Sequence, residues 1–299
     1  MKLNTEWKND YLSHCEHQLH LSYETLRSYQ VDLKQFHEFY KETDFNKESA
    51  FDYIEFLKTN LKTKSIIRKL NVIRSYFIYL NQQKLIDFNP YLQSTKEFKN
   101  PEVKATTIPL PYMKEIFLIT NENLKKAKST SKKIKNARDL AMIELLASTG
   151  IRASELYEIK LSDMNFENNI LSINGSNPRQ IPLTSETTVQ ALHNYYNLNI
   201  ENIIQGDYFF ISNQHQKVKD YQFRKILASI CEQSNLIPKD WKVTPIMFRN
   251  TFIELLLNNK VSINEIKQII GAKHISTTLL NRTKCEVNAL QSFNPRNLF

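Results

Sequence analysis

The sequence is poor in the residues that mark disulfide-rich and loop-rich proteins. Among its 299 residues there are only three cysteines and four glycines. Because Cys15, Cys231 and Cys285 are scattered and odd in number, we expect reduced thiols rather than a disulfide framework. Few glycines beside many Lys, Asn, Ile and Leu residues predict a chain that is mostly helical and has short loops.

Signals for membranes, export and bound metals are also missing. No apolar run approaches the roughly 20 residues that a membrane span needs, and the first residues lack the apolar core of a signal peptide. His14, Cys15, His17 and His20 lie close together, but no second cluster of ligands follows at zinc spacing. We therefore expect a cytoplasmic protein with no membrane partner, no metal and no cofactor.

What the sequence does have is an excess of positive charge. The formal net charge is +9, and most of the excess lies after residue 100. Residues 123–138 contain no acid but seven cations, which are Lys125, Lys126, Lys128, Lys132, Lys133, Lys135 and Arg138. Such a cluster favours a polyanion as partner, because each phosphate that is neutralised releases condensed counterions. A solvated loop is the alternative, and we expect the segment 121–137 to be largely loop.

Apolar residues recur at helical spacing through the first part of the chain and predict four helices there. We expect these helices at 5–20, 22–40, 47–59 and 63–82. The last of them carries a basic face, which comprises Lys64, Arg68, Lys69 and Arg74. Pro90 and Pro101 interrupt the polar stretch that follows. We therefore predict one domain over residues 1–98, a linker over 99–108 and a second domain over 109–299.

The second domain is predicted to be mainly helical with a small antiparallel sheet. Alternating residues over 169–183 indicate a hairpin or three-stranded sheet, and the apolar residues 208–211 indicate a short strand. Gly150 is expected to end one helix, and Ser154 to cap the next. Arg152 is thereby held in the tight turn between two helices. It is either an exposed arginine at a structural corner or a functional residue.

Three sequence boxes follow one another in this domain. Residues 149–156 read TGIRASEL, residues 244–252 read TPIMFRNTF, and residues 270–278 read IGAKHISTT. In these boxes and in its order of elements, nearly the whole chain resembles the tyrosine recombinases, or phage integrases, and its layout is closest to the Xer-type enzymes. The resemblance implies a four-helix core-binding domain of SAM-like fold and a mainly helical catalytic-type domain, which together clamp duplex DNA.

The chemistry of that family explains which side chains its site needs. A tyrosine hydroxyl attacks a DNA phosphate and forms a covalent phosphotyrosyl link, while two arginines stabilise the extra charge on the phosphate oxygens. Lysine and histidine move protons to and from the attacking and leaving oxygens. By resemblance, Arg152 and Arg249 match the two arginines, which would also hold a phosphate without any chemistry.

The remaining family positions depart from this pattern. Ile246 stands where the family has histidine, Ala272 where it has histidine or tryptophan, and Ser176 near the lysine position of the hairpin. Asn281 stands at the position of the nucleophile, and a carboxamide cannot attack a phosphate. The loss of the tyrosine does not depend on the alignment, because Tyr221 is the last of the 14 tyrosines.

The sequence therefore predicts a DNA-binding pseudo-recombinase that acts in DNA recombination or integration, or in its regulation. The residues expected to contact duplex DNA are Arg152, Arg249, Arg179, Lys64, Arg68, Lys69, Arg74, Lys132, Lys133 and Lys135. One alternative is an active recombinase with a nucleophile from a partner or from Ser276, Thr283 or Cys285. Another is a protein–protein adaptor without DNA binding. An active recombinase, or a second copy held through the apolar C-terminal tail, is a further expected partner.

Overall fold

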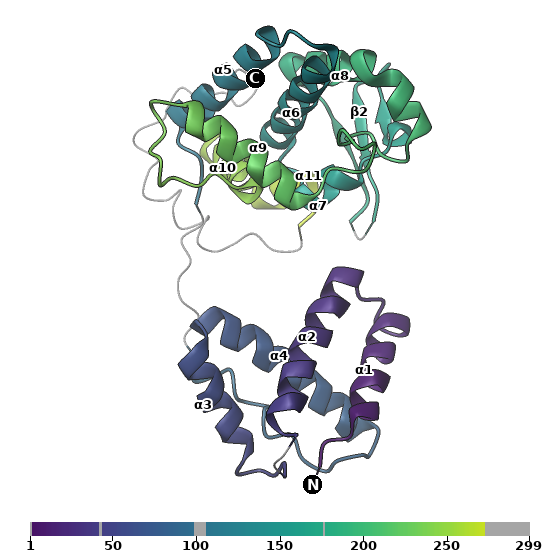
Figure 1. Cartoon of the computed structure of the whole chain (residues 1–299), viewed down its shortest axis with the longest axis vertical. Helices are drawn as coiled ribbons and strands as arrows, with labels where there is room; N and C mark the ends of the chain where they lie inside the picture. The colour runs from purple at the N-terminus through teal and green to yellow at the C-terminus, as the bar shows by residue number, and fades with distance from the viewer. Residues whose placement is uncertain (1, 42–43, 99–105, 176, 273–299) are drawn as a thin grey trace. The chain divides into compact units, whose positions relative to one another are not determined.

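A computed structural model describes residues 2–41, 44–98, 106–175 and 177–272 of the chain (Figure 1). The chain divides into two compact units, Met1–Glu102 and Val103–Phe299, and each has its own apolar core. The linker predicted over residues 99–108 lies largely outside the described residues, and its bounds stay a prediction.

The N-terminal unit is built from four helices around an aromatic core. The helices are α1 (Thr5–His17), α2 (Tyr23–Phe39), α3 (Ala50–Asn60) and α4 (Thr63–Gln82). The Ser22 side chain caps α2 by accepting from the backbone N–H of Thr25. In the core, the Phe36 ring packs edge-on against Tyr53 and Phe77. Burial of large aromatic side chains therefore holds α2, α3 and α4 together.

A half-buried histidine is expected to make this unit sensitive to acid. The His37 ring lies 3.1 Å from the Tyr76 hydroxyl, and burial, with a smaller contribution from Lys8, lowers the pKa of His37 to about 4. The unfolded chain takes up this proton near pH 6.5. The unfolded state therefore binds more protons between these values, and stability is lost as the pH falls from about 6.5 to about 4.

We expect the free energy of unfolding of the N-terminal unit to fall over that pH range. The His37→Gln variant should lose most of this pH dependence. The measurement is urea unfolding followed by Trp7 fluorescence in a Trp241→Phe background, because each unit contains one of the two tryptophans. If the free energy of unfolding depends on pH in the same way in the wild-type protein and in His37→Gln, a group other than His37 causes the loss of stability.

The C-terminal unit is mainly helical and is organised around one buried helix. Its helical elements are α5 (Leu110–Lys125), α6 (Thr130–Thr149), α7 (Ala153–Glu158), η1 (Leu161–Asp163), α8 (Glu186–Gln205), α9 (Asp220–Gln233), α10 (Pro245–Asn258) and α11 (Ile263–Ile270). Helix α6 runs through the middle of the unit and contacts α5, α8 and α10 (Figure 1). Because every residue from Ala137 to Ala147 is buried, α6 forms the core on which the other helices pack.

A small antiparallel sheet accompanies these helices, as the sequence predicts. Its strands β1 (Met164–Asn165), β2 (Ile170–Ile173) and β3 (Arg179–Pro182) pair in chain order. Leu171 is paired with Met164 on one side and with Ile181 on the other, and all three side chains are buried. The same register pairs Arg179 with Ile173, so this arginine enters at the first position of β3.

The basic segment 121–137 differs from the expected loop. Most of it is helical, since α5 extends to Lys125 and α6 begins at Thr130. The Ser129 side chain caps α6 by accepting from the backbone N–H of Lys132. The run of lysine and serine has no apolar period that would reveal a helix, and this capping contact is what starts one.

Two further expectations are wrong. The first helix ends at His17 instead of residue 20. No strand forms at 208–211 within the described ranges, where Ile211 makes only an isolated bridge with Lys217. Phe209 and Phe210 are buried in the helical core, which explains why this short segment is apolar without belonging to the sheet.

Within the described ranges, no helix is both long enough and apolar enough to cross a membrane. Nor do three His, Cys, Asp or Glu side chains gather there in a way that would hold a metal ion.

Candidate functional site

The end of α6 places Arg152 at a sharp corner. Gly150 ends α6 with φ +60°, a left-handed conformation that suits glycine, and a Cβ here would lie 2.4 Å from the Phe252 ring. Arg152 itself is the N-cap residue of α7, so the predicted cap, Ser154, lies inside the helix. The Glu155 carboxylate accepts from the backbone N–H of Arg152 at 2.8 Å, which satisfies one of the free donors at the start of α7.

Helix α10 supplies the second arginine from the interior. Arg249 is only 6% exposed. Its Nη1 donates to the carbonyl oxygen of Gly150 at 2.6 Å, and its Nη2 donates to that of Ile270 at 2.8 Å. Burial lowers the pKa of Arg249 to about 10, and the charge of Arg152 contributes to this shift. The guanidinium thus stays charged at neutral pH and joins the end of α6 to the end of α11.

Strand β3 supplies a third arginine, which shares a carboxylate with the first. Arg179 donates through Nη1 and Nη2 to the two oxygens of Glu155, each at 2.9 Å, and Arg152 pairs with Glu155 at 2.9 Å. Burial by itself would raise the pKa of Glu155, but the hydrogen bonds and charges of Arg179 and Arg152 outweigh it and hold the pKa below its usual value. The buried Glu144 carboxylate of α6 accepts from Thr187 and Thr188.

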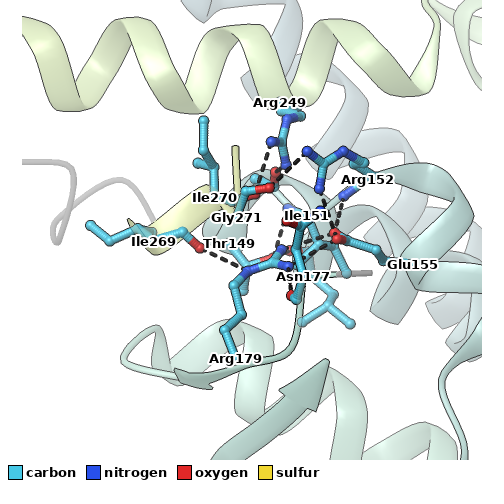
Figure 2. A network of polar contacts seen from close by, with 12 residues as sticks. Thr149, Ile151, Arg152, Glu155, Asn177, Arg179, Arg249, Ile269, Ile270 and Gly271 are labelled. Carbon is cyan, nitrogen blue, oxygen red and sulfur yellow. Dashed lines mark hydrogen bonds and ion pairs between the residues drawn. The ribbon is translucent and has the colours of Figure 1, made fainter. Parts of the chain in front are cut away.

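The three arginines meet on the last turn of α11 (Figure 2). Each donates to one of three successive carbonyl oxygens, in the pairs Arg179–Ile269, Arg249–Ile270 and Arg152–Gly271. The last carbonyls of a helix have no partner inside it and carry partial negative charge. They therefore stabilise the positive charges that the single carboxylate does not balance. Gly271 permits the approach, because a Cβ there would lie 2.6 Å from the Arg179 guanidinium.

This arginine cluster, formed by Arg152, Arg179, Arg249 and Glu155, has three positive charges and one negative charge. The Arg152 side chain is 35% exposed, and that of Arg179 is 10% exposed. An anion arriving from solvent would therefore meet Arg152 first, while the other two arginines act mainly through their charge. The arrangement suits a phosphate, because a guanidinium has five N–H donors and Arg152 uses two of its side-chain donors in the contacts described.

Two of the positions that depart from the family's pattern, Ile246 and Ala272, are described by the structure, and neither supplies a group for proton transfer. Ile246 lies on the first turn of α10 and is 56% exposed. Ala272 follows α11 and packs against the apolar cluster that contains Phe252. Neither side chain can carry a proton. The positions outside the described residues are Ser176, Ser276, Asn281, Thr283 and Cys285.

The predicted basic face of α4 contains both exposed cationic side chains and cationic side chains held in ion pairs. Lys64 is exposed and Arg74 is half-buried. Lys69 is only 8% exposed, and its Nζ lies 2.7 Å from the buried Asp32 carboxylate. Lys69 therefore does not face solvent, which corrects the expectation that it contacts DNA. Arg68 is exposed but makes a bidentate ion pair with the same Asp32. A phosphate would therefore have to share the Arg68 guanidinium with this carboxylate.

The lysines predicted to bind DNA in the second domain lie far from the arginine cluster. Lys132, Lys133 and Lys135 are in the first two turns of α6, whereas Gly150 ends that helix. At 1.5 Å per residue, about 27 Å of helix separates Lys132 from Gly150. Lys132 and Lys133 are exposed, and the Lys135 ammonium lies 2.9 Å from the Asp139 carboxylate. These lysines form a separate surface.

Family comparisons cover both units of the chain. Residues 118–282 match the phage integrase family, and residues 9–84 match the phage integrase N-terminal SAM-like domain. A tyrosine recombinase from Agathobacter rectalis is 34% identical over 276 residues, which cover 90% of this chain and 89% of the relative. The chain belongs to the phage integrase family of tyrosine recombinases. Tyrosine recombinase XerC of Thermodesulfovibrio yellowstonii is 28% identical over 281 residues, which cover 90% of this chain and 88% of the relative.

Solved structures of a recombinase and an integrase share this fold. The XerH site-specific recombinase bound to its palindromic difH substrate matches with a TM-score of 0.71 at 15% identity, over 94% of this chain and 84% of that chain. A lambda integrase dimer bound to a COC' core site matches with a TM-score of 0.66 at 14% identity, over 90% and 94% of the two chains. The predicted fold, a SAM-like helical domain followed by a mainly helical recombinase domain with a small sheet, is confirmed.

Two features of the arginine cluster have no signal in the sequence. The three acceptors on α11 are backbone oxygens, and no side chain indicates which arginine will reach them. Arg179 is predicted to contact DNA from the hairpin, but its guanidinium is directed to Glu155 and to the carbonyl of Ile269 (Figure 2). Its role in the structure is to position α7 and α11.

Proposed function

We propose that this chain is a tyrosine recombinase family member that binds duplex DNA and has lost strand cleavage. The observation that carries the proposal is that residues 222–299 contain no tyrosine, and that asparagine occupies position 281. Ile246 and Ala272 support it, because the proton-transfer groups of the family are absent together with the nucleophile. Two arginines remain, and phosphate contacts position a protein on DNA whether or not chemistry follows.

Related structures support duplex DNA as the partner, since XerH and lambda integrase were both solved on DNA sites. In this chain we assign the direct phosphate contact to Arg152, the most exposed member of the arginine cluster. Lys64 and Arg74 would add contacts from the core-binding domain, and the net charge of +9 attracts a polyanion. Such a chain would occupy a recombination site in the cytoplasm, alone or beside an active recombinase or a second copy of itself.

The test begins with selection of a bound site from random duplexes. The selected site is then prepared as a nicked suicide substrate, which traps any covalent intermediate, and an active XerC relative on its own nicked site is the positive control. We expect duplex binding whose affinity falls steeply with salt, and no covalent protein–DNA adduct on a denaturing gel.

Two outcomes would contradict this proposal in different ways. A covalent adduct would show that an unusual or partner-supplied nucleophile still cuts DNA. A selection that enriches no duplex, with no salt-dependent shift, would instead favour an adaptor that has lost DNA binding.

A further inference from the structure

We propose that the start of α6 is a second nucleic-acid backbone site, separate from the arginine cluster. We call it the α6 lysine surface and define it by Lys125, Lys126, Lys128, Lys132, Lys133 and Lys135, on the end of α5, the turn and the first turns of α6. A polyanion held here would be distinct from the one at Arg152, because about 27 Å of helix lies between the two places.

The position of Lys132 and Lys133 on α6 opposes the stability of the helix. The first turns of a helix carry partial positive charge and favour acids, yet the first turn of α6 contains no acidic residue. Two lysines therefore lie where the helix dipole repels them. A bound anion would remove this unfavourable interaction, whereas no ion pair within the described part of the chain does so for Lys132 or Lys133.

Ion pairs within the chain neutralise only part of the positive charge of the α6 lysine surface. Lys126 pairs with Glu122 at 2.6 Å. The buried Asp139 carboxylate is shared by Lys135 and by Arg138, which is itself buried. Among the described residues, no ion pair involves the remaining four lysines, which are Lys125, Lys128, Lys132 and Lys133. The surface therefore keeps four exposed ammonium groups that no described ion pair neutralises.

Three of these lysines, Lys126, Lys132 and Lys135, border a hollow between α5, α6 and α9. Its volume is about 400 Å³, and its polar lining includes Asn123, Lys126, Lys132, Lys135, Asn136 and Asp139, whose carboxylate is paired with Lys135 and Arg138. A neighbouring hollow of about 430 Å³ shares Lys135 and adds Lys225. Ammonium and carboxamide groups are those that contact phosphate and sugar in nucleic-acid complexes. Protein interfaces are depleted in lysine and centred on aromatic anchors, so the composition favours a nucleic acid over an acidic protein.

The test asks whether one protein captures two duplexes. A selected duplex is immobilised, the full-length protein is bound to it, and capture of a second, labelled duplex of random sequence is measured against salt. The test variant is Lys132→Gln/Lys133→Gln. The matched control is Lys114→Gln/Lys242→Gln, which removes the same charge from two other exposed lysines of the same unit.

We expect the test variant to reduce capture of the second duplex by about tenfold or more at 0.1 M salt, and to reduce the salt slope of that capture by about 2. Affinity for the immobilised duplex should stay within about twofold, since the arginine cluster is intact. The control should change neither quantity. The melting temperature of the test variant should be unchanged or higher, because two lysines leave the start of a helix.

Three results would overturn the proposal. Equal losses in test and control variants would show that only net charge matters. A parallel loss of affinity for both duplexes would place the lysines on the same surface as the arginine cluster. Displacement of the second duplex by poly-glutamate as efficiently as by unlabelled duplex would indicate an acidic protein partner.

The proposed function at Arg152 can fail independently of the proposal for the α6 lysine surface. It fails if the wild-type protein does not bind the immobilised duplex. The lysine surface is then tested with protein tethered directly and labelled duplex in solution. Unchanged binding by the test variant in that arrangement would overturn the proposal for the lysine surface.

Discussion

Replacement of Arg249 by methionine is expected to lower the free energy of unfolding of the C-terminal unit by about 2–4 kcal/mol. The change leaves the carbonyl oxygens of Gly150 and Ile270 without their charged donor, and each such hydrogen bond contributes about 1.5–3 kcal/mol. Relief of the repulsion from Arg152, and from Arg179, offsets part of the loss. The net effect is large because Arg249 joins two helix ends.

The measurement is urea unfolding followed by Trp241 fluorescence in a Trp7→Phe background. The matched control is Arg224→Met, which breaks an exposed ion pair with Asp220 and should cost less than about 1 kcal/mol. An Arg249 variant as stable as this control would contradict the view that α6 and α11 depend on this arginine.

Replacement of Arg152 by glutamine is expected to weaken duplex binding by about tenfold at 0.1 M salt, with the fold retained. The substitution removes one phosphate contact and should therefore reduce the salt slope of the binding constant by about 0.9. Because the Arg152 side chain is 35% exposed, solvent screens its contacts with Glu155 and Gly271, and their loss should cost little stability.

Fluorescence anisotropy titrations across a range of salt concentrations measure both quantities. Arg224→Gln is the control, since it makes the same chemical change at an exposed arginine of α9. If both variants lose the same affinity, a general effect of charge explains the result. If Arg152→Gln binds as tightly as the wild-type protein, the phosphate is held elsewhere.

Local features of this chain are determined by the sequence alone. Apolar spacing places most of the helices, Ser22 and Ser262 cap α2 and α11, and Gly150 and Gly271 end α6 and α11 with positive φ. These effects depend on residues within one or two turns, which is why the sequence reveals them. The absence of a tyrosine after Tyr221 is equally a property of the sequence, because no fold can give a segment a phenolic hydroxyl that the segment does not contain.

Only the tertiary structure decided which charges are free to meet a ligand. Arg179 and Glu155 are 24 residues apart, and Lys69 and Asp32 are 37 residues apart, yet each pair is in contact and largely buried. Lys132 and Arg152 belong to one stretch of sequence, but about 27 Å of helix, from Lys132 to Gly150, lies between them. The reason is that Coulomb and hydrogen-bond energies depend on distance in space, and in this molecule that distance is set by helix packing.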